Sequence, residues 1–125
     1  KNNISHINFS STSISDKAMA FVAGSPNLVY LNLRNTSITD RGIALIAKLE
    51  HLEYLNMVST QITDKSVNVI ANLKTLKSVY VYNSGITEKG IQLLQSALPN
   101  AKIVYWLFAS RINLIYINVC RAKFL

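Results

Sequence analysis

The chain has 125 residues, 50% of them hydrophobic, and a formal net charge of +7 at pH 7. This length fits one domain and the hydrophobic content is ample for a packed core, which excludes a largely disordered chain. The single cysteine, Cys120, excludes an internal disulfide framework and a multi-cysteine metal site.

The positive charge is unevenly distributed along the chain. Residues 1–100 carry 9 Lys and Arg against 6 acids, and residues 101–125 carry 4 against none. Charges of both signs alternate through the first hundred residues without a basic run, as on a solvated surface. A nucleic-acid partner is therefore disfavoured, because a phosphate-binding face needs clustered Lys and Arg.

A repeat, LxxLxLxxTxITD, runs through the chain with a period of 24 residues. Its first apolar position falls at Ile4, Leu28, Leu52 and Leu76, and then 25 residues later at Ala101. Such a period is the signature of a solenoid. No single unit can bury its own apolar side, so each unit must stack on the next.

Each unit changes its apolar spacing from alternate residues to three and four apart. Leu31 and Leu33 alternate, which predicts a strand buried on one face. After Asp40 the spacing predicts a helix, whose apolar residues are Ile43, Ile46, Ala47 and Leu49. Thr39 and Asp40 are expected to cap that helix with a hydroxyl and a negative charge. Thr63 and Asp64 are expected to do the same one unit later.

Over residues 4–106 this pattern resembles the leucine-rich-repeat family. The resemblance implies an α/β fold, a right-handed leucine-rich-repeat solenoid in a horseshoe arc, with a parallel β-sheet on the concave side and helices on the convex side. One departure is a hydroxyl where the family more often has Asn or Cys, at Thr12, Thr36, Thr60 and Ser84. These hydroxyls could still bond the backbone of a neighbouring turn in a stacked ladder.

We assign residues 1–108 to the solenoid, as about four repeats and the start of a fifth strand, and residues 109–125 to a C-terminal tail, a cap or other non-repeat segment. Strands lie about 4.8 Å apart and packed helices about 8 to 10 Å apart, so the stack should curve with its sheet inside.

The concave face should carry the strand side chains that point away from the core. Since side chains alternate along a strand, Tyr30, Asn32 and Arg34 belong to this face. The equivalent positions form three columns: His6, Tyr30, Tyr54, Ser78 and Ile103; Asn8, Asn32, Asn56, Tyr80 and Tyr105; and Ser10, Arg34, Val58, Tyr82 and Leu107. Five of the 6 tyrosines and none of the acids occupy these columns.

Tyr and Arg are the residues most often found at binding hot spots, so we predict a protein-binding site on the concave face. Its candidate residues are Tyr30, Asn32, Arg34, Tyr54, Asn56, Tyr80, Tyr82 and Tyr105. Two structural explanations stay open. The tyrosines could stabilise the sheet by packing across strands, and Asn8, Asn32 and Asn56 could form a hydrogen-bonded ladder.

The repeat pattern stops within residues 103–120, an apolar segment with Arg111 near its middle. A central Arg costs about 2.5 to 3.5 kcal/mol on membrane insertion. The favoured interpretation is a strand or loop that caps the last repeat. The alternatives are a membrane-spanning helix, for which this is the only candidate segment, and an exposed hydrophobic end left by truncation.

The sequence favours non-enzymatic recognition of a protein, with no catalytic residue, no metal site and no cofactor. His6 and His51 fall in different parts of the repeat, and the 4 glycines form no nucleotide-binding fingerprint. The alternative is a structural spacer or a repeat segment of a larger protein, such as a bacterial envelope protein or an F-box-type adaptor, to whose units the ITDxG form is similar. An enzyme is the third and least favoured class.

Overall fold

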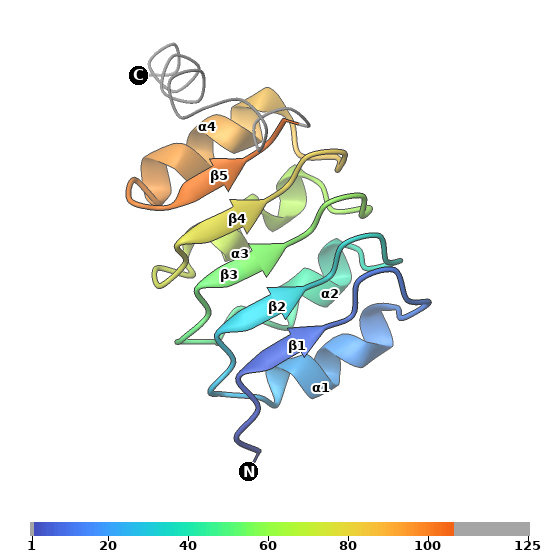
Figure 1. Cartoon of the computed structure of the whole chain (residues 1–125). Helices are drawn as coiled ribbons and strands as arrows, with labels where there is room; N and C mark the ends of the chain where they lie inside the picture. The colour runs from blue at the N-terminus through green and yellow to red at the C-terminus, as the bar shows by residue number, and fades with distance from the viewer. Residues whose placement is uncertain (1, 107–125) are drawn as a thin grey trace.

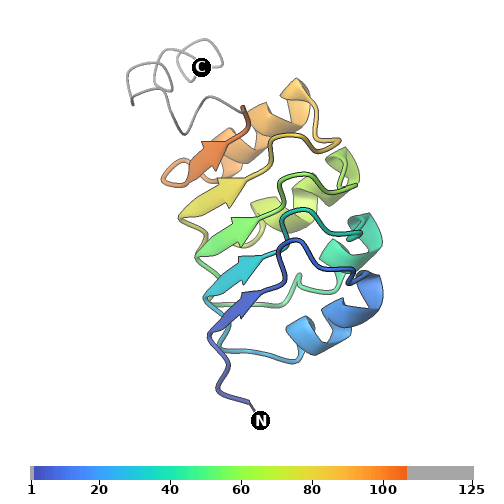
Figure 2. The same cartoon turned by 45° about the vertical axis from the view of Figure 1, so that its right-hand side comes forward.

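In the computed structural model, which describes residues 2–106, five short strands form one parallel sheet in chain order. The strands are β1 (His6–Asn8), β2 (Tyr30–Asn32), β3 (Tyr54–Asn56), β4 (Ser78–Tyr80) and β5 (Lys102–Val104). All the helices lie on one side of this sheet (Figures 1 and 2). The predicted α/β solenoid is confirmed. The predicted tail, residues 109–125, lies outside the described residues.

The return segments contain shorter helices than the apolar spacing predicts. They are the 3-10 helices η1 (Asp16–Ala18) and η2 (Asp64–Ser66) and the α-helices α1 (Met19–Ala23), α2 (Asp40–Ala44), α3 (Val67–Ala71) and α4 (Glu88–Ala97). After α2 the chain continues in turns, where the Ile46 N–H bonds the Ile43 carbonyl at 3.1 Å. Ile46 and Leu49 are buried as predicted, but Ala47 is exposed.

One hydrophobic core runs through the stacked units between sheet and helices. Leu28, Leu31 and Leu33 of the second unit have 0% exposure. Of their first-unit counterparts, Ile7 is buried, whereas Ile4 and Phe9 are only partly buried, because β1 is an edge strand of the sheet. Stacking between units therefore completes the burial of each apolar side, as the repeat predicts.

The strand register confirms the 24-residue period from β1 to β4. Tyr30 pairs with Tyr54, and Tyr54 with Ser78. At β5 the prediction is wrong by one residue, because Ser78 pairs with Lys102 and not with Ile103. The charged Lys102 stays exposed in this register while Ile103 enters the core.

The shift at β5 also changes the second column. Tyr80 pairs with Val104 and not with Tyr105. Tyr105 instead packs, partly buried, against the hydrophobic core. Ala101 nevertheless occupies a buried position before the strand, as predicted from its alignment with Leu76.

The Asp that ends each of the first three repeat motifs bonds the following unit. Asp40 Oδ1 accepts the backbone N–H of Thr63 at 2.8 Å, and Asp40 Oδ2 accepts the Thr63 hydroxyl at 2.6 Å. Asp16 holds Thr39 in the same way, and Asp64 holds Thr87. These three pairs are the Asp–Thr ladder.

The Thr residues of the ladder cap helices, as predicted. Thr39 Oγ1 accepts the Arg41 N–H, and Thr63 Oγ1 accepts the Lys65 N–H, each at 3.3 Å. The second set of hydroxyls does not form the ladder that we considered possible. Thr36 donates to the Leu33 carbonyl at 2.7 Å, within its own unit, and Thr12, Thr60 and Ser84 bond in the same way.

Candidate functional site

The open face is the side of the sheet that faces away from the helices (Figure 2). In the observed register its first two columns are His6, Tyr30, Tyr54, Ser78 and Lys102, and Asn8, Asn32, Asn56, Tyr80 and Val104. The loops after the strands align a third column of Ser10, Arg34, Val58 and Tyr82. The predicted last member of that column, Leu107, lies outside the described residues.

Aromatic rings on the open face contact one another across four strands, stacked from His6 to Tyr54 and tilted by 43° between Tyr54 and Tyr80. The Tyr30 and Tyr54 rings are nearly parallel, with centroids 4.3 Å apart, and His6 stacks on Tyr30 at 5.5 Å. Tyr54 contacts Tyr80 at 5.3 Å, diagonally, because the paired residue Ser78 carries no ring. We call His6, Tyr30, Tyr54 and Tyr80 the aromatic stack.

Lys102 extends this stack to β5, since its Nζ lies 6.0 Å from the centroid of the Tyr80 ring. Both ends of the stack thus carry nitrogen-containing side chains, His6 and Lys102. Burial raises the pKa of the Tyr54 hydroxyl, and its neighbours Tyr30 and Tyr80 raise it further. Tyr54 therefore stays a neutral phenol at physiological pH.

The asparagines of the second column bond within their own units. Asn32 Nδ2 donates to the Tyr30 hydroxyl at 3.4 Å, and Asn32 Oδ1 accepts the Arg34 N–H at 3.0 Å. Asn56 makes the same two bonds, to the Tyr54 hydroxyl at 3.2 Å and from the Val58 N–H at 3.0 Å. The idea of an asparagine ladder across strands is therefore wrong: these side chains fix each tyrosine hydroxyl and the loop after it.

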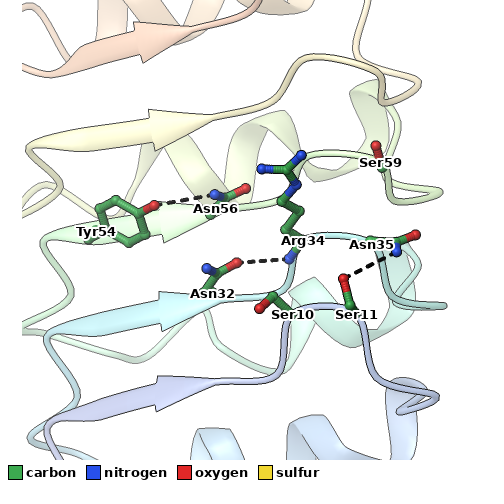
Figure 3. Close-up of a pocket in the computed structure, with 8 residues that line it drawn as sticks. All are labelled: Ser10, Ser11, Asn32, Arg34, Asn35, Tyr54, Asn56 and Ser59. Carbon is green, nitrogen blue, oxygen red and sulfur yellow. Dashed lines mark hydrogen bonds between the residues drawn. The ribbon is translucent and has the colours of Figure 1, made fainter. Parts of the chain in front are cut away.

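A polar groove of about 630 Å³ lies where strands β1 to β3 end (Figure 3). Its lining consists of Ser10, Ser11, Asn32, Arg34, Asn35, Tyr54, Asn56 and Ser59. Every one of these side chains carries a hydroxyl, an amide or a guanidinium. We call this the Arg34 groove.

A second groove, of about 410 Å³, continues from Arg34 toward β5. Arg34, Val58, Ser59, Tyr82, Asn83, Tyr105 and Trp106 line it. Val58, one of these lining residues, is only 1% exposed. The two grooves share Arg34 and Ser59, so a polar region and an aromatic region meet at the Arg34 side chain.

No acidic residue belongs to the columns or lines either groove among the described residues. Three of the chain's carboxylates, Asp16, Asp40 and Asp64, bond Thr residues in the Asp–Thr ladder. Glu53 is engaged with Lys77, whose Nζ lies 3.2 Å from its Oε1. The open face thus presents positive charge without its own counterions.

Seven of the eight predicted site residues meet on the open face. They are Tyr30, Asn32, Arg34, Tyr54, Asn56, Tyr80 and Tyr82. Tyr105 does not belong to its predicted column, because Val104 pairs with Tyr80 in the observed register. It does line the second groove. The site prediction omitted Lys102, because the predicted register did not assign it to the open face. It also omitted Ser11, Asn35 and Ser59, which lie in loops where the alternation of strand side chains does not apply.

The described residues offer no group of three or more His, Cys, Asp or Glu side chains that could hold a metal ion. In the same part of the chain, no helix has the length and apolar character needed to cross a membrane. Residues 103–120, the only candidate segment for membrane contact in the sequence, extend beyond the described residues, which end at 106.

Comparison with known families gives two adjacent matches. A family model described as a leucine-rich repeat matches residues 24–47 and again residues 48–71. The two matches are one period long, and the second begins where the first ends. No curated protein matches the chain.

Proposed function

We propose that this chain, in which residues 24–47 and 48–71 are leucine-rich repeats, is a non-enzymatic module that binds a protein through the open face of its sheet. Leucine-rich repeats are generally protein-interaction modules and are typically not enzymes. The observation that carries the proposal is the aromatic stack beside two grooves that share one arginine.

The chemistry of this surface suits protein binding. Tyrosines combine a large apolar ring with a polar hydroxyl at little cost in side-chain entropy, and arginine donates in several directions. Asn32 and Asn56 hold the hydroxyls of Tyr30 and Tyr54, so part of the surface is ordered before a partner arrives. Such preorganisation reduces the entropy lost on binding.

Selection of random peptides displayed on phage, with the full chain as the target, tests this proposal. We expect enriched peptides whose binding falls at least about tenfold in Tyr82→Ala, a loss of about 1.4 kcal/mol. Tyr82 takes no part in the aromatic stack, so this variant should stay folded. Leu93→Ala, an exposed apolar side chain (51%) on α4, is the matched control and should bind as wild type.

The second candidate is a rigid spacer in a larger protein, and the aromatic stack also favours it. The rings contact one another and so stabilise the sheet without any partner. If no peptide is enriched, or if Tyr82→Ala and Leu93→Ala bind alike, the spacer is preferred. Circular dichroism of each variant excludes unfolding as the cause of lost binding.

A further inference from the structure

We infer that the Arg34 groove is a subsite for a carboxylate, so that the partner presents an acidic peptide segment to the open face. This inference rests on the proposed function and specifies the chemistry of the partner.

The Arg34 side chain is free to bind an anion. Its backbone N–H is fixed by Asn32 Oδ1 at 3.0 Å, which anchors the loop, while the side chain is exposed. Figure 3 shows the side chain rising from the loop after β2 toward the loop after β3. Among residues 2–106, no carboxylate lies within 4.0 Å of the guanidinium, and the ion pair that forms, Lys77 with Glu53, excludes Arg34.

Ser11 and Ser59 line the groove with Arg34, and their hydroxyls can donate hydrogen bonds to a ligand. Asn35 Nδ2 donates to Ser11 Oγ at 3.3 Å, and Asn83 Nδ2 donates to Ser59 Oγ at 2.8 Å. Each serine oxygen already accepts a hydrogen bond, so its own hydrogen is available to an acceptor in the groove. The groove therefore offers donors on both sides of the guanidinium, an arrangement that fits an anionic oxygen.

The charge of the ligand follows from the number of cations in the groove. Arg34 is the single cation among the lining residues, and Lys102 lies over the Tyr80 ring at β5. Phosphate recognition usually uses a cluster of arginines, whereas one planar guanidinium matches one carboxylate through two parallel hydrogen bonds. A partner Asp or Glu fits the groove better than a phosphorylated residue.

Fluorescence anisotropy of the full chain with two labelled decapeptides tests the assignment. One peptide alternates Glu and Ala, and the other has Gln in place of each Glu. We expect the Glu peptide to bind at low salt, to weaken as salt rises, and to bind at least tenfold better than the Gln peptide. Arg34→Gln should lower its affinity by at least about tenfold, as the loss of a charge-assisted hydrogen bond predicts.

The matched control is Arg41→Gln, which removes the same charge from an exposed arginine on α2 and should bind as wild type. Arg34→Lys should retain part of the affinity, because it keeps the charge but loses the paired donors. The assignment is overturned if the Glu peptide does not bind, if Arg34→Gln and Arg41→Gln bind alike, or if a phosphoserine peptide binds more tightly than the Glu peptide.

The Tyr82→Ala variant separates failure of this inference from failure of the proposed function. If peptides selected on the open face lose binding in Tyr82→Ala but not in Arg34→Gln, the face binds protein and the carboxylate subsite is wrong. If both variants leave all peptide binding unchanged, the proposed function fails as well.

Discussion

Asp40 and Thr63, 23 residues apart, are joined by two hydrogen bonds, from the Thr63 N–H at 2.8 Å and the Thr63 hydroxyl at 2.6 Å. Asp40→Asn keeps the shape but removes the charge and one acceptor oxygen. We expect it to lower the free energy of unfolding by about 2 kcal/mol, because hydrogen bonds to a charged group stabilise a fold more than those between neutral groups. Urea denaturation of both proteins at pH 7 measures the difference.

Glu50→Gln is the control for the change in charge, since Glu50 is exposed and lies outside the Asp–Thr ladder. It should change the free energy of unfolding by no more than about 0.5 kcal/mol. Equal losses in the two variants would mean that net charge, and not the ladder, determines the effect.

The ladder also predicts how stability depends on pH. Burial alone would raise the pKa of Asp40, but hydrogen bonds from Ser66 and Thr63, with the nearby Lys65, lower it below its ordinary value of 3.8. The contribution of Asp40 is therefore complete above pH 3.8 and is lost as the pH falls through the lower, folded-state pKa. The stability gap between wild type and Asp40→Asn should close below that pH. A gap that stays constant from pH 7 to pH 3 would contradict this linkage.

Sequence periodicity predicted the sheet register wherever polar residues mark the exposed face. Tyr30 and Asn32 flank the buried Leu31, so a shift by one residue would bury both polar groups. Around β5 the residues Ile103, Val104 and Tyr105 are all apolar or aromatic, so alternation could not distinguish the two registers. In the register that forms, Lys102 is exposed and Ile103 is buried.

The ladder itself could not be predicted from one unit. Asp40 is adjacent to the helix cap Thr39, so a local interpretation assigns the carboxylate to its own helix. Only the stacking of units brings Asp40 to Thr63. The same holds for Asn35 and Ser11, whose bond joins residues 24 apart in loops that no hydrophobic pattern describes.

The stacked rings of Tyr30 and Tyr54 should be energetically coupled. Their centroids are 4.3 Å apart and the rings differ in tilt by 9°. In a double-mutant cycle of Tyr30→Ala and Tyr54→Ala, we expect a coupling of about 0.5 to 1.5 kcal/mol in the free energy of unfolding. Tyr30 and Tyr82 form no ring contact, so the corresponding cycle with Tyr82→Ala should show coupling near zero. Equal coupling in both cycles would argue against a specific stack.

Gly42 of the ITDxG form lies directly beneath the ladder carboxylate of the preceding unit. A Cβ at this position would meet Asp16 Oδ1 and come within 3.0 Å of Met19 Cγ. One unit later the position is Ser66, which is 1% exposed and donates its hydroxyl to Asp40 Oδ1 at 2.6 Å. The space can therefore accept a side chain that supplies a hydrogen bond to the carboxylate.

We expect Gly42→Ser to change the free energy of unfolding by less than about 1 kcal/mol, since its hydroxyl can bond Asp16 as Ser66 bonds Asp40. Gly42→Val should destabilise the chain by roughly 1 to 3 kcal/mol, because its methyl groups would press on the carboxylate and on Met19 without offering a donor. Gly24→Val is the control, since a Cβ there comes no closer than 3.4 Å to its neighbours. Urea denaturation ranks the three variants, and a Gly42→Ser variant as unstable as Gly42→Val would show that volume alone excludes side chains at this position.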